Sequence, residues 1–334
     1  MAYRLRIGSR PSQLALVQAN LIKQALEAGV NGLAAEIVAI ATRGDKMTSA
    51  SLARIGGKGL FIRELEQALA DGRIDIAVHS LKDLPAILPK QFRIAAVPER
   101  EDARDALLAN AINNPGTNDH ARLPALKHRA LVGTSSSRRH YELLRIRPDL
   151  EVVPLRGNVD TRLRRLAEGD FDAIVLALAG LRRLGKLGPI DGVSLHPLDD
   201  REFVPSGGQG ALVIEALCGH AIGGSAEIES AVASLNDARS SAEVTAERAL
   251  LATIGASCVS PVGVKGTVIG DQLALRALLF SADGSESLAA DSVTRLTSES
   301  DGFAAIAQSA GEALGEQMIA RGARAMIGQP DHGD

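Results

Sequence analysis

The sequence predicts an α/β protein with two similar α/β domains and a smaller α+β domain at its C-terminal end. Strand-like apolar runs alternate with amphipathic helical runs through most of the chain, which is typical of strand–helix–strand units. The segment 167–175 closely echoes the segment 70–78, which suggests that the plan of the first unit is repeated. Beyond a Gly-rich linker at 219–225, strands joined by short turns replace the alternation and predict the third domain.

The first unit opens with a strand at 4–8, a polar turn and a helix that ends at Gly29. Pro11 suits the first turn of this helix, because the missing N–H of a proline costs no hydrogen bond there. The polar stretch 42–59 is long for a connection inside a compact domain, and such loops are usually functional or disordered. The other predicted elements of this unit are a strand at 36–41, a helix at 60–70 and a strand at 74–78.

The same changes of period predict the elements of the second and third domains. In the second domain they are strands at 130–133, 151–155 and 173–175, with a helix after each of the first two. A buried strand at 211–216 follows the segment Pro205-Ser206-Gly207-Gly208-Gln209-Gly210. The third domain is predicted to contain helices at 241–254 and 302–320 and strands at 262–268, 273–280 and 287–296.

Alternation of strands and helices predicts mostly parallel sheets with right-handed crossovers. Ligands bind such sheets at the carboxyl ends of the strands. The polar turns that follow the strands are therefore the candidate binding segments of this chain.

Composition excludes several classes of protein. The 334 residues are 46% hydrophobic and 23% charged, with no apolar run of the ~18 residues that span a membrane, so we expect a soluble protein. The N-terminal segment has no signal-peptide pattern, and we expect a cytoplasmic location. A net charge of −3 and only eight aromatic residues (six Phe, two Tyr) argue against nucleic acid as a partner. Cys218 and Cys258 match no metal or redox spacing, so no metal site is expected.

Five arginines come just after predicted strands and indicate an anion-binding site: Arg10, Arg43, Arg138, Arg139 and Arg156. For any one of them a surface charge or a structural ion pair is the simpler explanation. Together, at the ligand-binding edges of two sheets, they favour a polyanionic ligand. The sequence has no phosphate-binding loop of the GxxxxGK[ST] type, so carboxylates fit better than phosphates.

Asp83 follows a strand that should be buried, so we expect its carboxylate at the floor of a cleft. It could be a helix cap or a partner of Lys82, or it could handle protons and stabilise positive charge in a substrate. His79 is more typical of a hydrogen-bonded core histidine. Cys258 lies in a turn of small residues, where both a small buried side chain and a reactive thiol are possible.

Taken together and in this order, motifs along nearly the whole chain resemble the porphobilinogen deaminase family. The motifs are Leu5-Arg6-Ile7-Gly8-Ser9-Arg10, Thr42-Arg43-Gly44-Asp45, Gly56-Gly57-Lys58-Gly59-Leu60-Phe61, His79-Ser80-Leu81-Lys82-Asp83-Leu84-Pro85, Gly133 to Arg139, Leu155-Arg156-Gly157-Asn158-Val159, Ala179-Gly180-Leu181, Gly208-Gln209-Gly210-Ala211 and the turn around Cys258.

The resemblance implies two domains like periplasmic binding proteins around a cleft, and a third domain that carries the cysteine. The implied boundaries are 1–102 with 203–222, then 103–202, then 223–334. The implied activity is that of hydroxymethylbilane synthase, a transferase that joins four porphobilinogen molecules with loss of ammonia onto a covalently bound dipyrromethane. The family also implies a monomer and a mobile lid at 45–57.

By motif match, the resemblance implies Asp83 as the catalytic residue and Cys258 as the thioether attachment point of the dipyrromethane. The residues implied for the cofactor's carboxylates are Lys82, Thr134, Ser135, Arg138 and Arg139. The residues implied for the substrate and the growing chain are Arg10, Ser12, Gln18, Lys58, Arg156, Arg162 and Arg183. Some positions depart from the family pattern, among them Ser137, where leucine is common.

Two other functions compete with this interpretation. A solute-binding protein that closes on a carboxylate ligand would explain the repeated α/β plan and the arginines, but not Asp83 together with Cys258. A cysteine hydrolase is weaker still, because no histidine has a recognisable family context.

Overall fold

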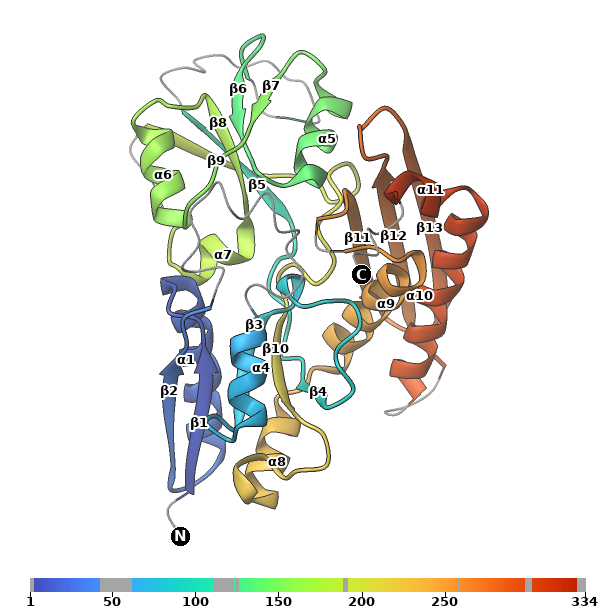
Figure 1. Cartoon of the computed structure of the whole chain (residues 1–334). Coiled ribbons are helices and arrows are strands. Elements are labelled where there is room, and N and C mark those ends of the chain that lie inside the picture. Colours follow the sequence, from blue (N-terminus) through green and yellow to red (C-terminus); the bar gives the residue numbers. More distant parts are fainter. Residues whose placement is uncertain are drawn as a thin grey trace, which may run out of the picture.

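The computed structural model describes residues 3–42, 62–110, 123, 126–188, 192–257, 259–297 and 302–328. Three sheets organise the chain (Figure 1): two mixed sheets of five strands each, one above the other in this view, and an antiparallel sheet of three strands beside them. Among the described residues, no helix is both long and apolar enough to cross a membrane.

The first sheet has the strand order β2-β1-β3-β10-β4. Strands β1 to β3 run parallel, and β10 pairs antiparallel with both β3 and β4. The bounds are β1 Tyr3–Ser9, β2 Leu33–Ala39, β3 Ile76–Ser80, β4 Phe92–Ala96 and β10 Leu212–Leu217. Helices α1 (Gln13–Gly29) and α8 (Ala226–Ser234) contribute to one core cluster of this sheet, and α4 (Arg63–Ala70) contributes to another.

The second sheet repeats this arrangement in the order β7-β6-β8-β5-β9. Again three strands are parallel, and the strand in fourth place, β5, is antiparallel to both neighbours. The bounds are β5 Asp105–Asn110, β6 Leu131–Gly133, β7 Glu151–Val153, β8 Ala173–Ala177 and β9 Val193–Pro197. Its helices are α5 Ser137–Ile146, α6 Val159–Ala167 and α7 Leu178–Arg183.

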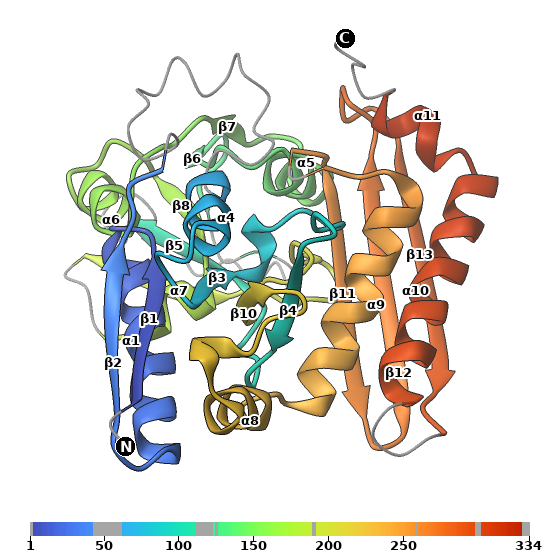
Figure 2. The ribbon, with the colours of Figure 1, turned by 60° about the horizontal axis from the view of Figure 1, so that its bottom comes forward.

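The third sheet is a meander of β11 (Val262–Ile269), β12 (Gln272–Phe280) and β13 (Ser287–Arg295). Helices α9 (Ala238–Ile254), α10 (Gly302–Ala320) and α11 (Ala323–Ile327) lie on one side of it, as Figure 2 shows. Helices α9 and α10 pack closely at Gly311, where a Cβ atom would lie 2.2 Å from the carbonyl oxygen of Ala246. The small side chains of the two helices therefore set their separation.

The prediction of mostly parallel sheets is confirmed in part: four strands of each sheet run in one direction, but the strand in fourth place is antiparallel to both neighbours, so both sheets are mixed. The sequence pattern does not predict β4, β5 or β9, and the antiparallel pairs involve these strands and β10. The strand in fourth place of each sheet connects to the other unit: β5 follows the first sheet in the chain, and β10 follows the second. The chain therefore crosses between the sheets twice. The strand that follows each crossing, β5 or β10, is antiparallel to its neighbours in the sheet.

Two element boundaries also differ from the prediction. The helix α1 begins at Gln13 rather than in the turn that contains Pro11, because the Ser12 hydroxyl accepts the N–H of Ala15 and caps the helix. The second strand is at Leu33–Ala39, a few residues before the predicted range, where it pairs in register with all of β1.

Candidate active site

A cavity of about 890 Å³ lies between the two five-stranded sheets, at the carboxyl ends of their parallel strands. In Figure 1 this place is where α7 of the second unit approaches α1 of the first. Segments that follow β1, β3, β6, β7 and β8 all contribute to its walls. Of the residues implied by the family resemblance, nine line this cavity: Arg10, Ser12, Gln18, Lys82, Ser135, Arg139, Arg156, Arg162 and Arg183.

The cavity wall is strongly basic. Among the described residues, its lining includes six cationic side chains and one acidic residue, Asp160, which lies 2.9 Å from Lys186. Burial, and then the positive charge of Arg139, lowers the pKa of Arg162 to about 10. Cations that are buried close to one another repel, so an anionic ligand with several charges would relieve the repulsion.

Lys82 reaches the cavity from a short 3-10 turn, η1 (Leu81–Asp83), that directly follows β3. Leu81 anchors the turn in the apolar core. The Lys82 ammonium donates to the side-chain oxygen of Gln209 at 3.1 Å. Burial, and next the charge of Arg139, lowers the pKa of Lys82 to about 8.

Arg138 and Arg139 lie in the first turn of α5, and both bind Asp105. Arg139 donates from Nε (3.1 Å) and Nη2 (2.7 Å) to one oxygen of Asp105, and Arg138 donates to the other at 2.6 Å. Burial alone would raise the pKa of Asp105, but the two guanidinium groups hold it well below its usual range. Asp105 thus keeps both arginines charged and oriented inside the protein.

The structure separates the roles of these two arginines. Arg139 lines the cavity, whereas Arg138 is enclosed: it also donates to Glu142 (2.7 Å) and to the carbonyl oxygen of Val204 (2.8 Å). The side chain of Arg138 is 4% exposed and is absent from the cavity lining. Its contacts are those of a residue that fixes α5 against the strand β5.

The small polar residues of the predicted site hold its loops in place. Thr134 is buried and its hydroxyl accepts the N–H of Ser136, while the Ser135 hydroxyl donates to the carbonyl of Leu155. The side-chain amide of Gln18 is hydrogen-bonded to the hydroxyl of Ser80, at 2.9 Å from its nitrogen.

Two of the predicted arginines also bind backbone oxygens beside the cavity. Arg183 donates to the carbonyl of Gly210 at 2.6 Å, and Arg162 donates to that of Gly157 at 2.8 Å. Arg10 and Arg156 both line the cavity as well.

Asp83 lies in a smaller pocket of about 60 Å³ next to the main cavity, and the two pockets share Arg10, Ser12 and Gln18. Asp83 therefore lines a pocket, as expected, but its side chain is exposed rather than buried there. The turn η1 directs Leu81 into the core and leaves Asp83, at its end, on the open side.

His79, in contrast to Asp83, lies in the core, which confirms the prediction of a hydrogen-bonded core histidine. It is buried, and its Nε2 lies 2.9 Å from a carboxylate oxygen of the buried Glu215 on β10.

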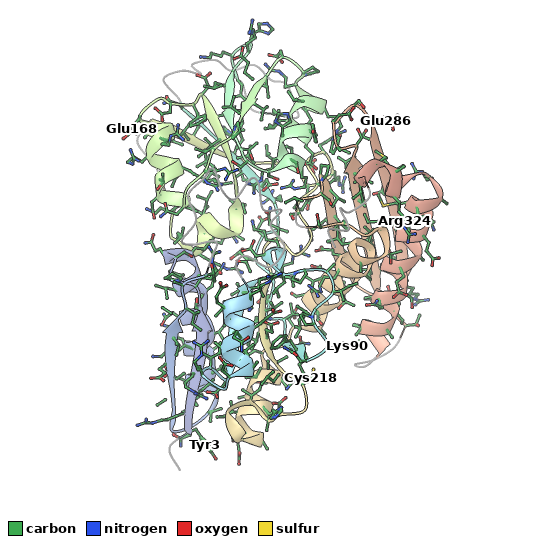
Figure 3. All side chains as sticks on the ribbon, in the orientation of Figure 1. Tyr3, Lys90, Glu168, Cys218, Glu286 and Arg324 are labelled. Carbon is green, nitrogen blue, oxygen red and sulfur yellow. The ribbon has the colours of Figure 1, made fainter. Side chains whose placement is uncertain are left out.

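Several residues implied by the resemblance lie outside the described part of the chain: Arg43, Lys58, the segment 45–57 and Cys258. The neighbours of Cys258 are described, and the carbonyl of Val259 accepts a hydrogen bond of 2.9 Å from the Ser137 hydroxyl at the start of α5. Cys218, by contrast, is exposed at the end of the first sheet that lies farthest from the second sheet, as Figure 3 shows.

Sequence reasoning assigned no role to Asp105 or Gln209, which together orient Lys82 and Arg139. Gln209 belongs to the motif Gly208-Gln209-Gly210-Ala211, which indicated the family but suggested no role for this side chain. No signal pointed to Asp105, because a single aspartate at the start of a short apolar run is common.

Comparisons of the sequence with known proteins match one family along most of the chain. The family profile described as "Porphobilinogen deaminase, dipyromethane cofactor binding domain" matches residues 5–221, and the profile "Porphobilinogen deaminase, C-terminal domain" matches residues 241–319. The chain is 42% identical to the porphobilinogen deaminase of Sulfurimonas denitrificans, over 98% of this chain and 97% of that protein. It is also 42% identical to that of Roseiflexus castenholzii, over 98% of this chain and 99% of that protein.

Among solved structures, an ancestral arginine-binding protein bound to arginine matches with a TM-score of 0.39 and 17% identity, over 70% of this chain and 93% of that chain.

Proposed function

Because the chain belongs to the porphobilinogen deaminase family, we propose that the basic cavity between its two five-stranded sheets is the site at which porphobilinogen molecules are joined. The protein is an enzyme of tetrapyrrole biosynthesis, hydroxymethylbilane synthase, with a domain for a dipyrromethane cofactor. The observation that carries the proposal is the set of six cationic side chains around one cavity.

The residues present fit such a cofactor and substrate. Each pyrrole of this chemistry carries an acetate and a propionate, so the ligand becomes more anionic as it grows. Guanidinium groups bind carboxylates through two parallel hydrogen bonds, and five of the six cations are arginines. We propose that Lys82 and Arg139 hold the cofactor's carboxylates, and that Arg10, Arg156 and Arg183 receive those of the substrate and of the growing chain.

Asp83 is proposed as the catalytic residue. Each condensation breaks the C–N bond of an aminomethyl group, forms a C–C bond, releases ammonia and removes one proton from the attacked carbon. Positive charge develops on the substrate pyrrole as ammonia leaves, and the Asp83 carboxylate, which lines the smaller pocket with Arg10 and Gln18, would stabilise it. The same carboxylate can accept a proton during the step.

Because Asp83 is exposed, we propose that the bound substrate itself shields this carboxylate from water. An exposed carboxylate interacts weakly with charge because water screens it, whereas a covered carboxylate interacts strongly. A pyrrole that enters the smaller pocket would cover Asp83, so binding and electrostatic activation would occur together.

Cys258 is proposed as the attachment point of the cofactor. When bound, the cofactor supplies the pyrrole carbon to which the first substrate molecule is joined. One contact supports this role: the carbonyl of Val259, the residue after Cys258, accepts a hydrogen bond from Ser137 in the first turn of α5, and the same turn carries Arg139.

The intact mass of the purified protein tests this assignment. Wild-type protein should carry an excess mass equal to two linked pyrrole units, or gain it after porphobilinogen is added, and Cys258→Ala should not. The proposal fails if the wild-type protein shows no excess in either case, or if the variant acquires the same mass.

Turnover of Asp83→Ala tests the catalytic role. We expect this variant to fold and to carry the cofactor but to consume no porphobilinogen, and near-normal product formation would overturn the assignment. A solute-binding protein would consume no porphobilinogen even as wild type, which distinguishes the two functions. A monomer located in the cytoplasm is part of the same proposal, and sedimentation and cell fractionation test it.

A further inference from the structure

The segment that immediately precedes β10 passes between the two five-stranded sheets and carries Gln209, whose side chain is 1% exposed. Its amide nitrogen donates to the carbonyl of Ala103 at 2.7 Å and to Asp105 at 2.9 Å. Its amide oxygen accepts the Lys82 ammonium at 3.1 Å, and it lies 3.5 Å from Nη2 of Arg139. Donors surround one end of the amide and acceptors the other, so the orientation of the amide is determined.

From this geometry we infer that Gln209 is a positioning residue whose neutral amide orients Lys82 and Arg139 toward the cavity without neutralising their charge. The inference rests on the proposed function, since it concerns how the same cavity keeps its attraction for carboxylates.

The chemistry at this position requires an amide. A glutamate would place a second carboxylate 2.9 Å from Asp105 and would form an ion pair with Lys82. An asparagine is one methylene shorter, so its amide cannot reach Asp105 and Lys82 at the same time. Methionine would leave the buried carbonyl of Ala103 and the Lys82 ammonium without this partner.

The surrounding charges show why neutrality matters. The buried group contains three basic side chains (Lys82, Arg138 and Arg139) and two acidic ones (Asp105 and Glu142), and burial raises the pKa of Glu142 to about 8. The exposed carboxylate of Asp83 also favours the charged form of Lys82. Among the described residues, Gln209 provides the one hydrogen-bond acceptor of the Lys82 ammonium. An ammonium has three N–H donors, so two remain for a ligand in the cavity that Lys82 lines.

The backbone around Gln209 is held as firmly as its side chain. The carbonyl of Gln209 accepts Nε of Arg100 at 2.9 Å, and the N–H of Gly208 donates to Glu247 at 2.6 Å. The carbonyl of Gly210 accepts Arg183, another cation of the cavity wall. The segment therefore orients three basic residues of the cavity wall (Lys82, Arg139 and Arg183) through neutral oxygens.

The variant Gln209→Glu tests the inference, with Gln272→Glu as the matched control, because Gln272 is exposed at the start of β12 in the third sheet and receives the same change of charge. The first readout is cofactor loading, followed by intact mass after porphobilinogen is added. We expect Gln209→Glu to load about tenfold more slowly than the control, because one unit of positive charge is lost at the cavity wall.

The second readout does not depend on the cofactor. Only the neutral amine of a lysine is acylated, so the rate of Lys82 acylation as a function of pH, followed on the Lys82 peptide, reports its titration. Gln209→Glu should shift this titration to higher pH by about one unit or more, since an opposite charge favours the ammonium. The control should leave it unchanged.

The variant Gln209→Asn covers the case in which the glutamate variant does not fold. It keeps the amide and adds no charge but releases Lys82, so we expect slower loading without the added negative charge. Wild-type loading in a folded Gln209→Asn or Gln209→Glu protein, or an unchanged Lys82 titration in Gln209→Glu, would overturn the inference. If the wild-type protein itself gains no mass, the proposed function fails, and the acylation experiment still decides the role of Gln209.

Discussion

Replacement of Glu247 by alanine should destabilise the protein severely and disturb the active site. Glu247 lies on α9 and is completely buried. One of its oxygens accepts Arg100 (2.7 Å) and the N–H of Gly266 (2.7 Å), and the other accepts Arg100 (3.1 Å) and the N–H of Gly208 (2.6 Å). This carboxylate therefore joins the third sheet to the segment that carries Gln209.

The expected loss follows from these four hydrogen bonds. Removal of one partner of a buried ion pair costs about 3–5 kcal/mol, because the other charge stays buried. Each buried N–H group left without a partner, at Gly208 and Gly266, adds about 1–3 kcal/mol unless water replaces the carboxylate. Since these effects overlap, we expect Glu247→Ala to lower the free energy of unfolding by about 4–6 kcal/mol, a large part of the 5–15 kcal/mol of a typical domain.

Urea unfolding followed by circular dichroism measures this loss. The matched control is Glu312→Ala, which removes an exposed glutamate of α10 and should change the free energy of unfolding by less than about 0.5 kcal/mol. Cofactor loading at a temperature where the variant stays folded should also be slower than in the control. A loss below about 1 kcal/mol would refute the reasoning, because it would mean that Glu243, 3.3 Å from Arg100, and water replace the buried carboxylate of Glu247 at little cost.

Three further predictions concern the cavity. Because burial lowers the pKa of Lys82 from 10.5 to about 8, the unfolded state binds more protons between these pH values, so the free energy of unfolding should rise with pH across that window. Cofactor-free Lys82→Met should lack this rise of up to about 3 kcal/mol, and parallel pH profiles of the two proteins would contradict the assignment. Gly210→Ala should lower the free energy of unfolding, measured in urea, by about 2–3 kcal/mol more than Gly219→Ala. Both glycines have positive φ, but of the two only Gly210 has a backbone oxygen, that of Glu101, 2.2 Å from the position of an added Cβ. Arg156→Lys should slow chain elongation in single-turnover assays while the unfolding midpoint stays the same, because an ammonium cannot form the two parallel bonds of a guanidinium; unchanged elongation would argue against the role of Arg156.

Much of the fold could be predicted from local patterns. The helix at 302–320 and the strands of the third sheet were predicted to within about one residue. Their regular apolar patterns extend over long segments, and the turns between the strands contain Gly or Asp. The strand β5 was missed because its short apolar run carries no alternation, and β9 was missed because it is five residues long and ends in a proline. A strand buried on both faces, such as β5, has no polar side from which a period can be read.

The candidate site was predicted unevenly for a similar reason. Arg10, Arg139 and Arg156 follow strands, and position after a strand is a local feature, so the sequence alone indicated that they could face one ligand. The exposure of Asp83 and the enclosure of Arg138 depend on which side of a turn or helix meets the core, and that is decided by contacts between distant segments. The division of the chain into three domains stays a prediction, as do the roles of Cys258 and Lys58.

The sequence by itself determined the class of fold, the basic character of the site and the family, because composition, period and motif order are properties of the chain. The tertiary structure alone decided which partners the buried basic residues have. Arg138 is bound on both sides by Asp105 and Glu142, whereas in the described part of the chain the Lys82 ammonium donates to one neutral oxygen, that of the Gln209 side chain. The physical reason is that the strength of a charge at a site depends on its burial and on its partners. Lys82 and Gln209 are more than a hundred residues apart in the chain and meet only when β3 pairs with β10 in the first sheet.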